Sequence, residues 1–529
     1  MRLLVVGGGS AGMAAALQAR ELQADVTLLE ADEVGGTTLN RGPAPVRTLA
    51  RAARLARDWG SWEAFGLRGS APEPDLPKIL ARSEEVARYA RDAKRLPAYL
   101  SGYGVDLAEH TGQVSFTDPN TVTSSDGRRW QGDAIIVAVG GYAAPLPVPG
   151  AHLALTYNDI PSLTSLPSSV AIVGGADTGC QIASILSDFG VSVTIFEAGP
   201  TLVASADQAV SQGLARSFEA QGIRVRTGTI VTALEQHGSS LQVRHAKTQP
   251  AQPAQAAQAA QAAQAAQAAQ AAQAAQAAQA AQGAQAAQAG DDAQSDTASF
   301  DAVFTAIGWP ANIEALALDK AGVQATKAAI PVDQYMRTNV PHIFAAGDVN
   351  GQAKLVQFAR GEGRIAAQNA VEGPRHTASY RIVPSASFTD PEYGQVGLTE
   401  AQARAQANAR DQANARDQAN ARDIVTATAD YEHLLRPVAD GRPNGFCKLI
   451  ADRRDHTILG GHVLGEYSAE IIQVIATAMT ANLTVDQVAV IPFAFPTFTE
   501  AVGMAAQMIC RDLGIGRFPR VWSLLDSAG

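Results

Sequence analysis

The first thirty residues pass from an apolar run to a glycine-rich turn, an alanine-rich stretch and a second apolar run. Residues 2–6 (RLLVV) predict a buried strand, the glycines after them a turn, AAALQAR a helix, and VTLLE at 26–30 a second strand. Together they make a βαβ unit. Residues 169–197 repeat the pattern, so we expect two nucleotide-binding units, and two nucleotides suggest electron transfer between them.

The rest of the chain divides into two organised blocks and two repeats. One block, around residues 300–351, has two apolar runs with glycine turns, and the last, from about Tyr380, mixes strand-like runs with a long apolar helix. An AAQ repeat covers about 248–297, and QANARD recurs over 406–423. Neither repeat offers large apolar residues to bury, so we predict passive insertions in surface loops, with a protein-binding arm as the alternative.

Composition narrows the class of protein. A chain of 529 residues is expected to hold two to four domains, and a net charge of −10 argues against binding to nucleic acid. No apolar run reaches the roughly 20 residues of a membrane span, and the start of the chain lacks the pattern of a signal peptide, so we expect a cytoplasmic protein without membrane insertion.

The cysteines are too few and too scattered for a disulfide framework or a zinc site. The only three are Cys180, Cys447 and Cys510, and we expect each to be a small buried apolar residue. No metal site is predicted.

Each βαβ unit carries a dinucleotide fingerprint. In the first, Gly7, Gly9 and Gly12 form GxGxxG after a strand and before a helix, and Glu30 ends the next strand, where its carboxylate can accept from ribose hydroxyls. The second fingerprint has an alanine in the middle, and its acidic residue favours NADH over NADPH because a carboxylate repels an additional phosphate and no arginine follows it closely. Its residues are Gly174, Ala176, Gly179 and Glu197.

With these motifs in place, the sequence resembles the flavoprotein disulfide reductases, the group of dihydrolipoamide dehydrogenase, glutathione reductase and mercuric reductase. The resemblance also rests on IFAAGDVNG at 343–351, AVGGYAAPLPVPG at 138–150 and FTDPEYGQVGLTEAQA at 388–403. It implies an α/β fold with two Rossmann-like dinucleotide-binding domains, for FAD and NAD, plus a C-terminal α+β dimerisation domain, and hence a homodimer.

The resemblance assigns domains and cofactor contacts. It implies an FAD domain at 1–149 and 309–378, an NAD(P) domain at 150–308 and an interface domain at 379–529. The implied FAD residues are Gly7, Gly9, Gly12, Glu30, Gly36, Thr37, Gly140 and Asp348. The implied NAD residues are Gly174, Ala176, Gly179, Glu197 and Gly308.

The chain departs from the family at the positions of the two redox-active cysteines. The family motif GGTCLNxGCxPSK reads here GGTTLNRGPAPVR at 35–47, so Thr38 and Pro43 replace the two cysteines. Neither side chain can form a thiolate, which excludes thiol-disulfide exchange at this site. The family's lysine on the same helix becomes Arg47, and its partner glutamate becomes Gln181, so that ion pair is lost.

The C-terminal motif changes in the same direction. The family's HxHPTxxE reads FAFPTFTE at 493–500, so Phe495 replaces the acid-base histidine, and Glu500 loses its partner and is expected to be solvated or to start a helix. The resemblance implies a slot at the flavin lined by Thr38, Pro43 and, from the partner subunit, Phe493 and Phe495. Such a flat aromatic slot suits a quinone or a similar planar acceptor, although the phenylalanines could instead plug the old channel.

These observations predict an FAD-dependent oxidoreductase that passes electrons from NAD(P)H, with NADH preferred, through FAD directly to a small acceptor such as a quinone. Two alternatives stay open. The loss of the middle glycine at Ala176 and of the ion pair suggests a flavoprotein with another electron donor, and Asp177 stands where the family often has an aromatic or aliphatic lid. The other alternative is a non-catalytic flavin-bound scaffold or sensor.

Overall fold

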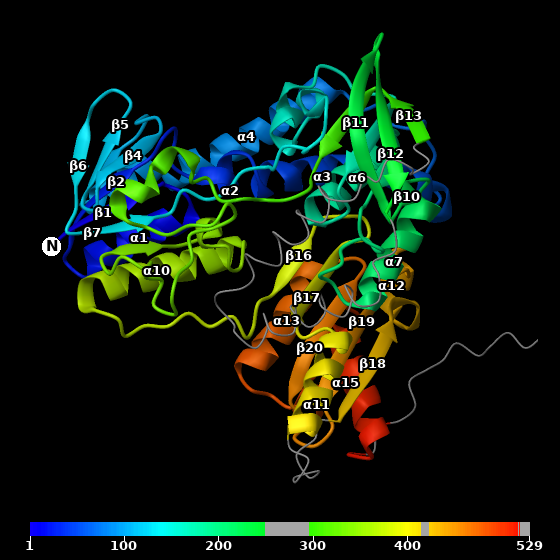
Figure 1. Cartoon of the computed structure of the whole chain (residues 1–529). Helices are drawn as coiled ribbons and strands as arrows, with labels where there is room; N and C mark the ends of the chain where they lie inside the picture. Colours follow the sequence, from blue (N-terminus) through cyan, green and yellow to red (C-terminus); the bar gives the residue numbers. More distant parts are fainter. Residues whose placement is uncertain (249–295, 414–422, 517, 519–529) are drawn as a thin grey trace, which may run out of the picture. The chain divides into compact units, whose positions relative to one another are not determined.

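The structure, a computed structural model, describes residues 1–248, 296–413, 423–516 and 518 (Figure 1). These residues form two compact units, each assembled from segments that are far apart in the sequence. The first unit comprises the described residues of 1–52, 74–167 and 229–379, and the second those of 53–73, 168–228 and 380–529. Most of the AAQ repeat and part of the QANARD repeat lie outside the described residues, while residues 406–413 belong to a helix.

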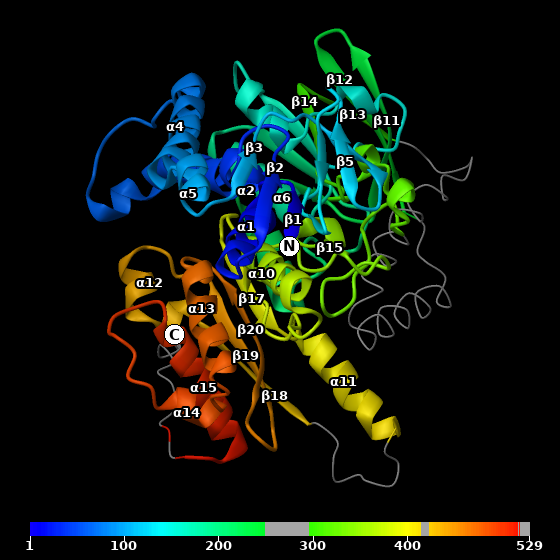
Figure 2. The ribbon, with the colours of Figure 1, turned by 90° about the vertical axis from the view of Figure 1, so that its left-hand side faces the viewer.

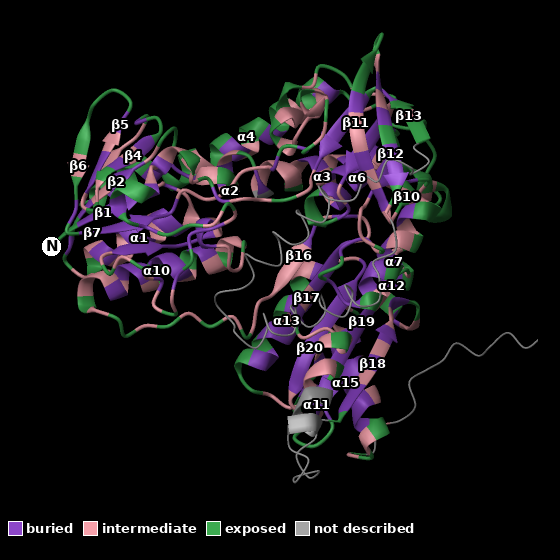
Figure 3. Ribbon diagram, viewed as in Figure 1, coloured by how far each residue is buried: buried purple, intermediate pink, exposed green. Residues whose placement is uncertain are grey.

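The first unit is built on a parallel five-stranded sheet. Its strands run in the order β15 (Ile343–Ala345), β7 (Ala134–Val137), β1 (Arg2–Val6), β2 (Asp25–Leu29) and β3 (Asp106–Ala108), and every neighbouring pair is parallel. The three central strands are almost wholly apolar and buried, as Figure 3 shows, because a parallel sheet is covered on both faces.

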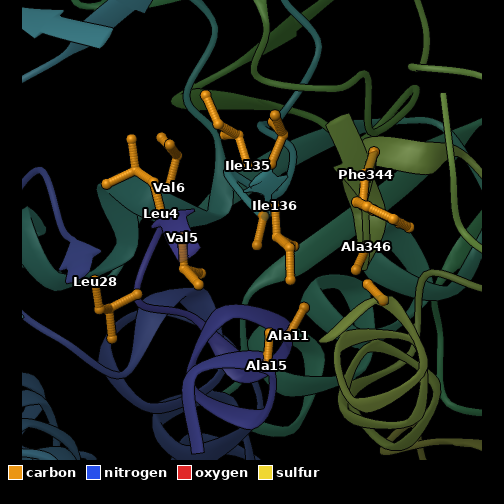
Figure 4. Packing of buried hydrophobic residues seen from close by; sticks show 14 of the residues in the cluster. Leu4, Val5, Val6, Ala11, Ala15, Leu28, Ile135, Ile136, Phe344 and Ala346 are labelled. Carbon is orange, nitrogen blue, oxygen red and sulfur yellow. The ribbon is translucent and has the colours of Figure 1, made fainter. Parts of the chain in front are cut away.

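Two helices pack against each other beside this sheet. They are α1 (Ser10–Glu21) and α10 (Val356–Glu372), which are far apart in the sequence. A Cβ on Gly363 would lie 2.1 Å from the carbonyl oxygen of Ala11, so only glycine lets the two backbones approach this closely. Figure 4 shows Ala11 and Ala15 of α1 below the buried side chains of the strands.

The remaining elements of the first unit surround this core. Two antiparallel sheets follow the orders β4-β5-β6 and β11-β12-β13. Their strands are β4 (Val114–Asp118), β5 (Thr121–Ser124), β6 (Arg129–Gln131), β11 (Thr229–His237), β12 (Ser240–Lys247) and β13 (Asp296–Phe300). Strand β14 (Ala302–Thr305) belongs to neither of these two sheets. The helices are α2 (Gly36–Asn40), α4 (Leu76–Lys94), α5 (Leu96–Gly102) and α3 (Pro43–Asp58), which contributes residues to both units.

The second unit contains the second βαβ element. Strands β8 (Ser169–Val173), β9 (Ser192–Phe196) and β10 (Arg224–Arg226) are parallel, in the order β10-β9-β8. Helix α6 (Asp177–Asp188) joins β8 to β9, and α7 (Gln208–Ala220) joins β9 to β10. Both predicted βαβ units are therefore confirmed.

The C-terminal part of the second unit is an antiparallel sheet covered by helices. The sheet order is β16 (Ser385–Ser387), β17 (Tyr393–Gly397), β20 (Ile458–Leu464), β19 (Phe446–Asp452) and β18 (Ile424–Asp430). Figure 2 shows α13 (Ser468–Thr480) and α15 (Glu500–Leu513) together on one face of it. The other helices are α11 (Glu400–Ala413), α12 (Leu435–Ala439) and α14 (Val485–Ala489). This mixture of strands and helices confirms the expected α+β character.

A buried ion cluster ties the βαβ element to this sheet. Lys448 on β19 is almost fully buried and donates to Asp207 at 2.8 Å and lies 2.7 Å from Glu400. Asp207 also caps α7 by accepting from the N–H of Ala209. The hydrogen bond from Lys448 lowers the pKa of Glu400. Burial alone would raise the pKa of Asp207, but the hydrogen bonds from Lys448 and backbone N–H groups lower it.

Within the described residues, no helix is both long and apolar enough to cross a membrane. The four-block domain boundaries given above stay a prediction.

Replacing Lys448 by methionine is expected to lower the free energy of unfolding by about 3–5 kcal/mol, because two carboxylates lose their buried cation. Since both carboxylates have lowered pKa values, their stabilisation of the native protein is present at neutral pH and is lost on acidification, and Lys448→Met should weaken this acid dependence. Urea unfolding of the holoprotein between pH 4 and pH 7 measures both effects. Arg436→Ala, which breaks the exposed pair with Asp440, is the control and should leave the midpoint nearly unchanged.

Candidate functional site

The first fingerprint forms a tight turn between β1 and α1. Gly7 has φ of +105°, and a Cβ on Gly12 would lie 1.8 Å from the carbonyl oxygen of Gly7, so both positions require glycine. Gly9 precedes the helix, and a Cβ there would meet only the Cα of Gly36, at 3.8 Å. The N-terminus of α1 has no side-chain cap among the described residues, and a helix start of this kind binds anions.

The second fingerprint has nearly the same backbone. Gly174 has φ of +107°, and a Cβ on Gly179 would lie 1.9 Å from the carbonyl oxygen of Gly174. Ala176 precedes α6 with φ −84° and ψ −172°, close to the −76° and −168° of Gly9. These angles suit any L-residue, so the alanine causes no backbone strain and adds only one methyl group to the turn.

Each turn is held by the acidic residue that ends the next strand. Glu30 accepts from the N–H of Gly8 at 2.7 Å and from that of Asp32 at 3.0 Å. Glu197 accepts from the N–H of Gly175 at 2.6 Å, and its other oxygen accepts from Gly199 at 2.6 Å. The carboxylates therefore shape the turns, and their remaining lone pairs are available to ribose hydroxyls.

Asp348 lies in a turn that a buried glutamate supports. Glu362 of α10 accepts from the N–H of Gly347 at 2.7 Å and from the side chain of Asn350 at 2.8 Å. The indole N–H of Trp309 donates to Asp348 at 2.9 Å. Burial raises the pKa of Asp348, and the indole hydrogen bond opposes that rise.

Trp309 is itself fixed from two sides. The ring of Tyr157 lies 5.5 Å from it, centroid to centroid, and the ammonium group of Lys354 donates to its carbonyl oxygen. Burial raises the pKa of Tyr157 to about 12, so its hydroxyl stays neutral at physiological pH. Tyr157 and Lys354 thus hold Trp309 in place, and Trp309 in turn holds Asp348.

The segments that carry Gly140 and Gly308 run antiparallel to each other. The N–H of Asn312 donates to the carbonyl oxygen of Gly140, and that of Ala144 donates to the carbonyl oxygen of Gly308, so the two glycines lie at opposite ends of this pairing. Gly308, predicted at the NAD site, lies in the first unit, while the other four NAD residues lie in the second unit.

The two positions that carry cysteines in the family, Thr38 and Pro43, lie on two helices separated by a short break. Gly36, Thr37 and Thr38 belong to α2, and Pro43 begins α3 after a break at residues 41–42. Proline has no N–H to donate, so it suits the first position of a helix and cannot continue the one before it. The Thr38 hydroxyl lies 3.0 Å from the hydroxyl of Ser10, at the start of α1.

The two positions that carry the family's ion pair belong to different units. Arg47 lies exposed on α3 in the first unit, and Gln181 is half-buried on α6 in the second. The loss of the family's ion pair at these two positions stays a prediction.

The two phenylalanines of the C-terminal motif differ in burial: one packs on a helix and the other is exposed. A Cβ on Gly503 would lie 2.8 Å from the ring of Phe493, so this ring packs on α15 of its own unit. Phe495 is 71% exposed. Glu500 begins α15 and accepts from the N–H of Thr497 at 3.1 Å, which is the helix-start role that the sequence allowed.

The three cysteines are buried and unreactive, as expected. Burial raises the pKa of all three thiols, to about 12 for Cys447 and about 11 for Cys510, and in Cys180 nearby carboxylates add to it. None forms a thiolate readily at neutral pH.

Sequence reasoning missed three contacts that long-range packing creates. Trp309 reaches Asp348, and the Tyr393 hydroxyl donates to Asp177, the first residue of α6. Arg226 pairs with Phe196 across β9 and β10 and lies over its ring at 5.7 Å, which brings a cation next to the strand end that carries Glu197. The only sequence signal for Arg226 was the apolar-basic alternation of RVR.

Residues 1–363 match the family described as pyridine nucleotide-disulphide oxidoreductase, and residues 383–506 match the dimerisation domain of that family. A dihydrolipoyl dehydrogenase of Zymomonas mobilis is 30% identical over 507 residues, which cover 94% of this chain and 96% of the relative. A glutathione reductase of a Nostoc species is 27% identical, covering 91% of this chain and 94% of the relative.

A solved structure shares the fold. The HOCl-induced flavoprotein disulfide reductase RclA from Escherichia coli aligns with a TM-score of 0.76 and 21% identity, covering 96% of this chain and 100% of that chain.

Replacing Trp309 by phenylalanine keeps an aromatic ring and removes the N–H donor to Asp348. If Asp348 binds FAD, the loss of one hydrogen bond to a charged group should weaken FAD binding roughly tenfold. The measurement is the fluorescence of flavin released on serial dilution of the purified holoprotein. Trp130→Phe, on β6 of the same unit, is the control; equal flavin retention in the two variants would contradict this role.

Proposed function

Because this chain belongs to the pyridine nucleotide-disulphide oxidoreductase family, we propose that it is an FAD-dependent oxidoreductase that oxidises NADH and reduces a small planar acceptor, such as a quinone, without a redox-active disulfide. The family uses FAD and NAD(P)H. In the overall reaction the nicotinamide gives up a hydride, which supplies two electrons and one proton, and the quinone takes these together with one proton from water to become a hydroquinone.

The observation that carries this proposal is the chemistry at the two thiol positions. Thr38 and Pro43 stand there, Thr38 is engaged with Ser10, and no thiolate can form. The three cysteines are buried elsewhere, with raised thiol pKa values. Electrons therefore have no disulfide to enter by the family's route, and a direct acceptor is the simplest alternative.

The first unit fits FAD. The uncapped start of α1, with an open space at Gly9 that a Cβ would narrow, suits a pyrophosphate. Glu30 would accept from the ribose, and Asp348, held by Trp309, would accept from hydroxyls of the flavin's sugar chain. When bound, FAD supplies the ring that takes up a hydride and passes electrons on.

The second unit is the proposed site of the nicotinamide dinucleotide. The start of α6 would hold its pyrophosphate, and Glu197 would accept from an unmodified ribose, which favours NADH. Arg47 and Gln181 are the groups proposed near the reacting atoms.

The acceptor slot is proposed to form in a homodimer. The chain carries the family's dimerisation domain, and the exposed Phe495 offers an aromatic surface to another subunit. Phe493 packs on α15, and its place in the slot stays part of the proposal.

A variant without cysteine tests the proposal. The triple substitution Cys180→Ala, Cys447→Ala and Cys510→Ala should retain most of the NADH-dependent quinone reduction, because no thiol takes part. Steady-state NADH oxidation with a quinone panel measures this, with flavin content as the control for folding.

The three single substitutions, Cys180→Ala, Cys447→Ala and Cys510→Ala, provide a second readout if the triple variant folds poorly. Unchanged turnover supports the proposal. Loss of activity with full flavin content, in either experiment, would show that a thiol carries the electrons after all.

A further inference from the structure

The two nucleotide turns share one backbone but differ in charge at the first helical residue. Ser10 opens α1, whereas Asp177 opens α6. A carboxylate in the first turn of a helix is stabilised by the helix dipole, which is the same field that attracts a phosphate. Asp177 therefore places a carboxylate at the start of α6, where α1 has the neutral Ser10.

In both turns the side chain at this position is held by a hydroxyl from another segment. Ser10 pairs with Thr38, and Asp177 accepts from the hydroxyl of Tyr393 on β17. Tyr393 is 3% exposed, so it is fixed in the sheet, whereas Asp177 itself is exposed. The tyrosine thus holds one oxygen of the Asp177 carboxylate, and although the residue as a whole is exposed, burial of this carboxyl group raises its pKa.

The start of α6 offers the Asp177 carboxylate a second position. Ala176 has no side-chain group to cap α6, and no side chain caps this helix among the described residues. A carboxylate released from Tyr393 would lie within the first turn of α6, where the helix dipole that attracts a phosphate also stabilises its charge. There it would compete directly with a pyrophosphate.

We propose that Tyr393 is a positioning residue that holds the Asp177 carboxylate aside, and that this hydrogen bond sets the affinity of the α6 turn for the pyrophosphate of a nicotinamide dinucleotide. The inference rests on the proposed function, since it concerns the same NADH site. Asp177 lowers the affinity through its charge, and Tyr393 limits that effect.

A double-mutant cycle tests the proposal with NADH as the probe. Asp177→Asn should tighten NADH binding several-fold, because it removes like-charge repulsion, and the gain should shrink as salt is raised. Tyr393→Phe should weaken binding several-fold when Asp177 is present. In the Asp177→Asn background, Tyr393→Phe should have no effect, since the charge that it positions is gone.

Dissociation constants for NADH, measured by calorimetry on FAD-loaded enzyme at low and high salt, provide the readout. The matched control is Tyr431→Phe, which removes another buried tyrosine hydroxyl of the same unit, bonded at 3.1 Å to the carbonyl oxygen of Glu466, and should leave NADH binding unchanged. Flavin content and thermal midpoint show whether each variant folds.

The outcomes separate the inference from the proposed function. If Tyr393→Phe weakens binding equally in both backgrounds, or Asp177→Asn fails to tighten it, the positioning role is wrong while NADH use stands. If neither the native enzyme nor Asp177→Asn binds NADH or NADPH, both the inference and the proposed electron donor are overturned.

Discussion

The contact between the third glycine of each fingerprint and the carbonyl of the first determines what this protein can bind. With less than 2 Å between a hypothetical Cβ and that oxygen at Gly12 and Gly179, any larger residue would push the helix away from its strand. The glycines bring the helix starts close to the strand ends, and Glu30 and Glu197 then hold the turns from the neighbouring strands. The chain thus retains two equivalent dinucleotide turns.

Around these turns, the sequence departs from the family at the positions of the two thiols and of their base. Proline at position 43 ends one short helix and starts the next, and Thr38 is bound to Ser10 at the first turn. Phe495 replaces a proton-transferring group by an exposed apolar ring, and Glu500 serves as a helix-start residue. These changes agree with one another, since a thiol pair and its base are useful only together, and they are compatible with electron transfer straight to a planar acceptor.

Local sequence patterns predicted the two βαβ units, both glycine turns and their acidic residues, because strand, turn and helix are set by neighbours in the chain. They also predicted the buried cysteines. Patterns did not predict the partners of Asp348 and Asp177, because Trp309 and Tyr393 lie 39 and 216 residues away. Such contacts depend on tertiary packing, which no local periodicity encodes. Gly308 was predicted at the NAD site from the family resemblance, and packing pairs it with Ala144.

The number of electrons that the purified enzyme takes up per FAD tests the central claim most directly. A flavin accepts two electrons, and a redox-active disulfide would accept two more. In an anaerobic titration with NADH, followed by flavin absorbance, we expect the flavin to be completely reduced after one equivalent of NADH per FAD. Uptake of two equivalents would reveal a disulfide in the pathway, and no bleaching by NADH or NADPH, in protein that dithionite still reduces, would contradict the proposed donor.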